Sequence, residues 1–137
     1  MGYQDLIAKA RAQVEKPETV DVPVVVGDEL VTLTFTKLLG ADWIELSRLN
    51  APRAGSQLDQ NLGYNVDAVA GAYPADKITV NGEAGAAEEW AELFSLLDAP
   101  ARTNVATGLW GLNHYGPAQR AVELGKASRA SSKRKRN

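Results

Sequence analysis

The strongest hydrophobic pattern of the chain lies between residues 86 and 114. Apolar side chains recur there every three or four residues, which places them on one face of an α-helix. The first stripe consists of Trp90, Leu93, Phe94 and Leu97. The second stripe consists of Val105, Leu109 and Leu112. Asp98-Ala99-Pro100 separates the two stripes, because the residue before a proline avoids the α region. We therefore predict an αα-hairpin of two packed helices at the centre of the core.

A second pattern, the alternation of apolar and polar residues, predicts a β-hairpin ahead of these helices. The apolar positions of its two strands are Val20, Val22, Val24 and Val26, then Val31, Leu33 and Phe35. Gly27-Asp28-Glu29 forms the turn, and Pro23, which lacks an N–H donor, indicates that the first strand lies at an edge. Further along, residues 77–80 are a short extended piece, and Asn81-Gly82 is a turn signal.

Shorter helices flank these elements. A helix over about residues 3–15 is too short to be stable alone, so we expect it to dock on the rest of the protein. A second helix is expected to begin with Asp42 as its N-cap. Its inward-facing residues would be Trp43, Leu46 and Leu49.

The segments after this helix alternate between loop and helix. Residues 52–63 are polar and contain glycine, which predicts an exposed loop. Asn65 is expected to cap a third helix that points Val66 and Val69 inward. Gly116-Pro117 is expected to open a last helix with a small apolar face, and Gly125 to end it.

The predicted fold class is α+β and mostly helical. A β-hairpin near the N-terminus packs on a bundle of about five short helices. A chain of 137 residues suits one domain, which we place at residues 1–126. Residues 127–137 contain nothing that would be buried, so we expect them to form a disordered basic tail.

Composition narrows the class of protein. There is no cysteine, so neither a disulfide nor a thiolate metal site is expected. No apolar run approaches the roughly 20 residues of a membrane span, and the N-terminal residues lack the apolar centre of a signal peptide. These features predict a cytoplasmic protein that makes no membrane contact.

The net charge of −2 conceals a strong asymmetry. Residues 1–125 carry nine Lys/Arg against seventeen Asp/Glu, a net charge of −8, while residues 126–137 carry six Lys/Arg and no acid, a net charge of +6. The acidic body argues against a nucleic-acid-binding domain. The basic end, Lys133, Arg134, Lys135 and Arg136, is a candidate for binding a partner, with a solvated terminus as the alternative.

The chain offers little chemistry. His114 is its one histidine, and its neighbours Asn113 and Tyr115 are weak partners for acid–base catalysis, so we expect a partly exposed histidine at a helix C-terminus. The carboxylates of Glu88, Glu89 and Glu92 fit the start of a helix better than a metal site. No catalytic, cofactor-binding or metal-binding residue is predicted, and we do not expect an enzyme.

Trp110 is the best candidate for an aromatic residue that faces a partner. It lies about 100° around the helix from Leu109, on the flank of the apolar stripe. The alternative is that it is buried against the first helix. Gly108 and Gly111 lie on either side of it, and glycine costs roughly 1 kcal/mol inside a helix, so another element should pack closely there.

Several segments together resemble a known family. They are VTLTFTKLLGADWIELSRLNAPR (31–53), LGYNVDAVAGAYP (62–74), VNGE (80–83), EEWAELFSLLDAP (88–100), ATGLWGLN (106–113) and AVELGKAS (121–128). Their order and spacing resemble the tail assembly chaperones of siphophages that infect actinobacteria. The resemblance runs from about Val20 to Ser128 and rests on aromatic, proline and turn positions.

The resemblance implies a protein that binds the long tape-measure protein, keeps it soluble and helps to recruit tail-tube subunits. It implies action in the host cytoplasm and absence from the finished virion. It further implies that this is the short form of a pair, the longer form arising by ribosomal frameshift. Leu124-Gly125-Lys126 can be encoded by a slippery heptamer, and the coding DNA would decide. Self-association is a further expectation.

Two other functions remain open. A structural tail or head–tail connector subunit would stay in the particle, so protein analysis of purified virions separates it from a chaperone. A small nucleic-acid-binding adaptor that acts through its basic tail would lose affinity steeply with salt.

Overall fold

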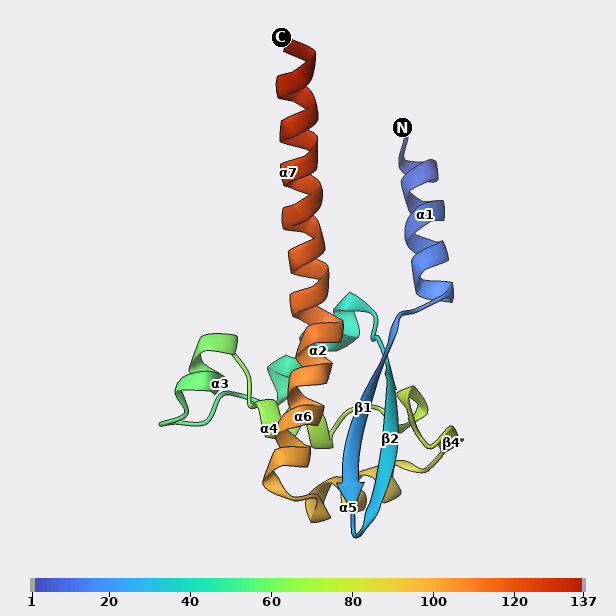
Figure 1. Cartoon of the computed structure of the whole chain (residues 1–137), viewed down its shortest axis with the longest axis vertical. Helices are drawn as coiled ribbons and strands as arrows, with labels where there is room; N and C mark the ends of the chain where they lie inside the picture. The colour runs from blue at the N-terminus through green and yellow to red at the C-terminus, as the bar shows by residue number, and fades with distance from the viewer. Residues whose placement is uncertain (1, 137) are drawn as a thin grey trace.

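The computed structural model describes the backbone of residues 2–136 and the side chains of residues 2–131. It is an α+β fold, mostly helical, as predicted. A small antiparallel sheet packs against the helices, and two helices project from one end of the molecule (Figure 1). We call the part without these two projecting helices, residues 17–115, the body.

The sheet is larger than the predicted hairpin. Strands β1 (Thr19–Val26) and β2 (Glu29–Thr36) form that hairpin, and β1 is an edge strand as Pro23 indicated. Beyond β2 lie β3 (Ile78–Val80) and β4 (Glu83–Ala84), in the order β1-β2-β3-β4. Asn81 and Gly82 join β3 to β4 with φ angles of 49° and 83°, values that suit a tight hairpin turn.

The body also contains a set of short helices. They are α2 (Gly40–Leu49), α3 (Gln57–Leu62), α4 (Val66–Gly71), the 3₁₀ turn η1 (Ala75–Lys77), α5 (Ala87–Leu96) and α6 (Ala99–Trp110). The residues of both predicted stripes are buried except Leu93, which is partly buried. The αα-hairpin was wrong, because α6 packs chiefly on β1 and α4, while α5 packs chiefly on α4 and η1.

Aromatic side chains join the sheet to the helices at the centre of the core. Phe35 of β2 is fully buried, with its ring centroid 5.8 Å from that of Tyr73 and 5.6 Å from that of Trp90. The indole N–H of Trp90 donates to the Ala70 carbonyl at 3.0 Å. This contact gives the one polar group of Trp90 a partner, as a buried donor requires.

Close packing at Gly108 brings α6 against β1, as the sequence predicted for this glycine. A Cβ atom added to Gly108 would lie 2.8 Å from Cγ2 of Val22, closer than carbon atoms approach. At Gly111 nothing lies within 4 Å of such an atom, so the same expectation was wrong there.

The helix that begins at Ala99 does not end at Trp110. It continues through a π-helical turn, η2 (Gly111–Tyr115), into α7 (Gly116–Arg136), so the last helix extends α6 rather than standing apart. Pro117 has no N–H group for the helical ladder, and wider turns accommodate such a defect. The amide of Gly116 donates to the Gly111 carbonyl, and a Cβ atom there would lie 2.7 Å from that oxygen. Gly125 does not end the helix, which was a wrong prediction.

Asn113, in the π-helical turn, connects this helix to the sheet. Its Oδ1 accepts a hydrogen bond from the Leu38 amide at 2.9 Å, and its Nδ2 donates to the hydroxyl of Tyr73 at 3.1 Å. Tyr73 in turn donates to the Thr36 carbonyl at 2.6 Å, and its burial raises its pKa to about 12. Asn113 is therefore a structural anchor and not a partner of His114.

Three predictions about the middle of the chain need correction. Leu39, not Asp42, is the N-cap of α2, and Asp42 lies in its first turn. Trp43 is buried, but Leu49 is 65% exposed, because α2 ends at the surface. The expected loop over residues 52–63 contains helix α3. The prediction for α4 is confirmed, since Asn65 Oδ1 accepts from the Ala68 amide at 3.0 Å.

The first helix, α1 (Tyr3–Glu15), forms where predicted, but its docking on the protein was a wrong expectation. Every side chain of α1 is exposed. It projects from the same end of the body as α7 (Figure 1). An ion pair of 2.7 Å between Arg120 and Glu18 ties the base of α7 to the start of the sheet. In α7, the predicted apolar face of Ala118, Ala121 and Val122 is also exposed.

Candidate functional site

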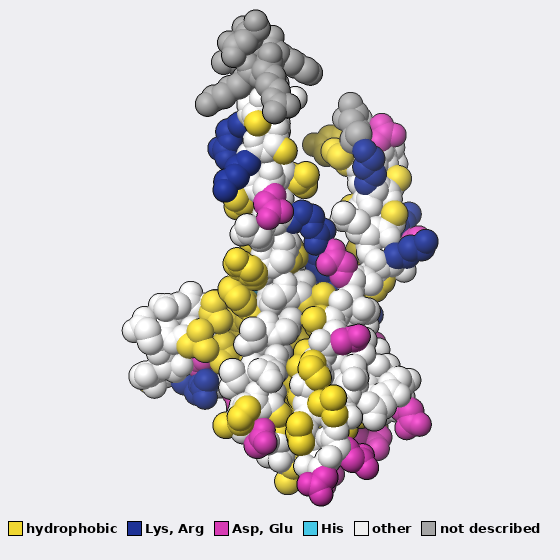
Figure 2. Space-filling view, in the orientation of Figure 1, with side chains coloured by type: hydrophobic (Ala, Val, Ile, Leu, Met, Phe, Trp, Pro, Cys, Tyr) yellow, Lys and Arg dark blue, Asp and Glu magenta, His cyan; other side chains and the backbone are white. Residues whose placement is uncertain are grey.

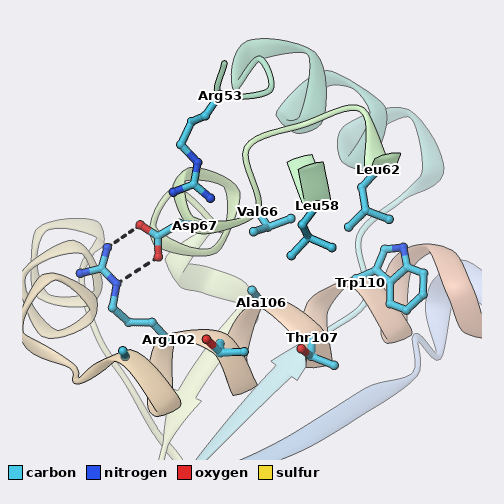
Figure 3. Close-up of a pocket in the computed structure, with 11 residues that line it drawn as sticks. Arg53, Leu58, Leu62, Val66, Asp67, Arg102, Ala106, Thr107 and Trp110 are labelled. Atoms are coloured by element: carbon cyan, nitrogen blue, oxygen red, sulfur yellow. Dashed lines mark hydrogen bonds and ion pairs between the residues drawn. The ribbon is translucent and has the colours of Figure 1, made fainter. Parts of the chain in front are cut away.

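An apolar groove lies between helix α6 on one side and helices α3 and α4 on the other. Its volume is about 510 Å³. The side chains that form its middle are Leu58, Leu62, Val66, Ala106 and Thr107. Figure 3 shows the three aliphatic side chains of α3 and α4 pointing toward α6, with the Trp110 indole closing the groove at one end.

A buried carboxylate holds the α3 wall in place. Asp59 has no exposed surface, and it accepts hydrogen bonds from the backbone amide and the guanidinium of Arg53 at 2.7–3.1 Å. The Val66 amide donates to the same carboxylate at 3.3 Å. The hydrogen bonds from the Arg53 guanidinium, together with these amides, hold the pKa of Asp59 well below its usual range despite burial.

The turns around α3 follow from its sequence. Ser56 caps the helix, accepting from the Asp59 amide at 3.2 Å, and Gly63 ends it in the left-handed conformation with φ of 86°. With both ends fixed, the two leucines of α3 point to one side. Leu58 remains 57% exposed, so the groove has an apolar rim that water reaches.

The two ends of the groove differ in chemistry. At one end Arg102 of α6 forms an ion pair with Asp67 of α4, and the Nε–Oδ1 distance is 3.0 Å (Figure 3). The guanidinium of Arg102 also lies 4.7 Å above the ring centre of Phe94. At the other end Trp110 stacks on Tyr115, with ring centroids 4.8 Å apart. The groove therefore offers an apolar centre, a charged end and an oriented aromatic ring.

These features suit the apolar face of a helix or a small apolar ligand. Sites that accept apolar groups are lined by aliphatic and aromatic side chains with few polar groups, as here. A helix that binds in a groove inserts side chains spaced by three and four residues.

The predicted site residues have mixed outcomes. Trp110 is half-buried, lies at the groove and does not pack against α1. The side chains of Lys133, Arg134, Lys135 and Arg136 lie outside the described residues. His114 is exposed, but it lies in the π-helical turn within a continuous helix, so its placement at a helix C-terminus was wrong. Glu89 accepts from the Ala86 amide at 2.8 Å at the start of α5, as predicted.

Neither a metal cluster nor a membrane span is found in the described part of the chain. Among those residues, no group of three or more His, Cys, Asp or Glu side chains is placed to hold a metal ion. In the same residues, no helix has the length and hydropathy needed to cross a bilayer.

Sequence reasoning missed the α3 wall of the groove. The signal was present, because Ser56 is followed three residues later by Asp59, a capping pattern, and Gly63 is a C-terminal signal. Leu58 and Leu62 are spaced by four residues, as on one helix face. Two apolar residues in so short a segment are a weak periodic signal, and the polar residues around them outweighed it.

Comparison with known proteins adds no relative. No protein-family model, no curated protein and no solved structure matches this chain. Function must therefore be argued from the residues and their arrangement.

Proposed function

We propose that this protein is a phage tail assembly chaperone that binds the tape-measure protein. The sequence resemblance suggests the family, and the observation that carries the proposal is the apolar groove between α3 and α6. A long helical protein awaiting assembly exposes apolar stripes, which aggregate unless they are covered. A groove with leucine walls and a half-buried tryptophan can cover part of such a stripe.

The arrangement of Trp110 supports its role as the anchor. Tryptophan dominates many interfaces because it buries a large area with few rotatable bonds. Stacking on Tyr115 fixes one face of the indole. The groove residues nearest to it in the middle of the groove are mostly aliphatic, so the partner side chains that fit there are Leu, Ile, Val, Met or Phe.

The proposal includes the rest of what the resemblance implies. The chaperone would act in the host cytoplasm, help to recruit tail-tube subunits and be absent from the virion. A longer form made by frameshift near Leu124-Gly125-Lys126 would share the body. Since none of these three residues of α7 is buried, a change of reading frame there would leave the buried core intact.

Co-expression with the tape-measure protein tests this function. The fraction of tape-measure protein in the soluble lysate should rise several-fold when this protein is present. Leu58→Glu, at an exposed groove position, should abolish the effect, and Trp110→Ala should weaken it. Ile44→Glu is the matched control, because Ile44 is 67% exposed on α2, outside the groove.

Each variant must first give the wild-type circular dichroism spectrum and melting temperature. Equal solubility of the tape-measure protein with and without this protein would contradict the proposal. The presence of this protein in purified virions would instead favour a structural tail or connector subunit.

A further inference from the structure

Helix α1 carries an apolar stripe that nothing in the described protein covers. Tyr3, Ile7, Ala10 and Val14 are spaced by four, three and four residues, the spacing of a coiled-coil seam. Leu6 lies beside them, and Leu6 and Ile7 are 51% and 44% exposed. A helix of 13 residues is marginal alone in water. A partner that covers the stripe would stabilise α1.

The end of the molecule from which α1 and α7 project differs in charge from the rest of the protein. We call α1 and the part of α7 with described side chains, residues 2–16 and 116–131, the arm. The arm carries six Lys/Arg and three Asp/Glu, and four more Lys/Arg follow it in the sequence. Residues 17–115 carry five Lys/Arg and fourteen Asp/Glu, a net charge of −9. Figure 2 shows Lys and Arg around the arm and a cluster of Asp and Glu at the opposite end.

The tip of the β1–β2 hairpin lies at the end opposite the arm (Figure 1). We call residues 25–30 the hairpin end. Asp28 and Glu29 lie at its turn. Val25 and Leu30 face each other across the strands and are 56% and 72% exposed. The hairpin end thus pairs an uncovered apolar patch with acidic side chains.

We propose that this protein associates head to tail with a second copy, the α1 stripe of one copy packing on the hairpin end of the next. Each surface has an apolar centre, and the arm, with a net charge of +3, is opposite in sign to the acidic turn of the hairpin end. Two arms would instead bring like charges together, which disfavours twofold pairing. Nucleic acid would match the arm's charge but has no aliphatic face to cover Leu6 and Ile7.

The exposed area fits this arrangement. The chain exposes 9455 Å², against about 6,900 Å² expected for a compact monomer of its mass. The excess is roughly 2,500 Å², and a standard interface removes about 800 Å² from each partner. A copy that uses both its arm and its hairpin end would bury about twice 800 Å². This area is smaller than the excess exposed area of the chain. Head-to-tail contacts of this kind build rings or open chains.

This inference does not depend on the tape-measure proposal, and sedimentation velocity on the whole chain tests it. At about 0.05 M salt the weight-average mass should rise above 14.7 kDa as concentration increases. At about 0.5 M salt the apparent Kd should be at least about tenfold weaker, because exposed charges are screened. A mass of 14.7 kDa at every concentration up to about 0.5 mM would overturn the proposal.

Variants identify the two surfaces. Leu6→Ser/Ile7→Ser should weaken association at least about tenfold, and it should leave the body folded because α1 buries no side chain. Ala8→Ser/Ala12→Ser is the matched control on the opposite face of α1 and should associate like the wild type. Loss of association in both double variants would overturn the role of the stripe. It would show that association requires only that α1 be helical.

Charge reversal separates head-to-tail from arm-to-arm pairing. Asp28→Lys/Glu29→Lys should be monomeric, whereas a twofold arm-to-arm dimer would be unaffected, and this second result would overturn the proposal. Mixing that variant with Arg11→Glu/Lys126→Glu/Arg129→Glu should restore association, because the arm of each variant then meets a hairpin end of opposite charge. A monomeric wild type that binds a 20-nucleotide DNA would also overturn the proposal and assign the arm to nucleic acid.

Discussion

Substitution of Gly108 by alanine tests the contact between α6 and β1 on which the body depends. Alanine is favoured over glycine inside a helix by about 1 kcal/mol. The new Cβ atom, however, would lie 2.8 Å from Cγ2 of Val22. Valine is stiff about χ1, and strand β1 is hydrogen-bonded along its length to β2, so the clash should cost about 2 kcal/mol. Gly108→Ala should therefore lower the free energy of unfolding by about 1 kcal/mol.

A second substitution removes the clash and completes a double-mutant cycle. Val22→Ala alone should cost about 2 kcal/mol, because Val22 is only 5% exposed and the change leaves a cavity. In the double variant the alanine at 108 partly fills that cavity, so the total loss should be about 1 kcal/mol instead of the additive 3. Urea unfolding followed by tryptophan fluorescence gives each value. Losses that add to within about 0.5 kcal/mol would refute the close packing of Gly108 on Val22.

Three further predictions follow from the core, the buried carboxylate and the chain end. Phe94→Ala should lower the free energy of unfolding by about 3–5 kcal/mol in the same assay, because Phe94 is 3% exposed. The control Leu96→Ala, at a position that is 76% exposed, should lower it by less than about 1 kcal/mol. Similar values for the two variants would contradict the placement of α5. The ion pair with Arg53 lowers the pKa of Asp59 in the folded protein from 3.8, so the stabilisation that this pair provides is present above about pH 4 and is lost as the pH falls. Asp59→Asn should therefore make the free energy of unfolding fall less steeply with pH below about pH 5. An unchanged slope would contradict the role of the pair. Deletion of residues 127–137 should change the melting temperature by less than about 2 °C at high salt, because no side chain of residues 127–131 is buried, and a drop of many degrees would show that this end docks on the body.

The parts of the fold that sequence predicts are those with long, regular periodicity. The two hairpin strands and the two helical stripes, over residues 90–97 and 105–112, each have three or four apolar residues at the spacing of one element type. Which of these elements pack against one another could not be predicted in the same way. Helix α6 packs on β1 because Gly108 permits close approach, and periodicity does not state which element approaches. The αα-hairpin expectation failed for this reason.

The short elements of the fold have too few residues to give a clear periodic pattern in the sequence. Strand β3 has three residues and is defined by its pairing with β2, which lies more than forty residues earlier in the chain. The π-helical turn depends on Gly116 and Pro117, which sequence reasoning took as the start of a new helix. Within the candidate site, Trp110 was predicted but the α3 wall was not, because its capping residues were read as loop.

Site-directed photo-cross-linking tests the central claim, that the groove between α3 and α6 binds the tape-measure protein. A photoreactive amino acid at position 58, on the groove rim, should give a covalent adduct with co-expressed tape-measure protein after irradiation. The same amino acid at position 44, which is similarly exposed on α2, should give little adduct. Equal adducts from both positions, or an adduct from position 44 alone, would contradict binding in the groove.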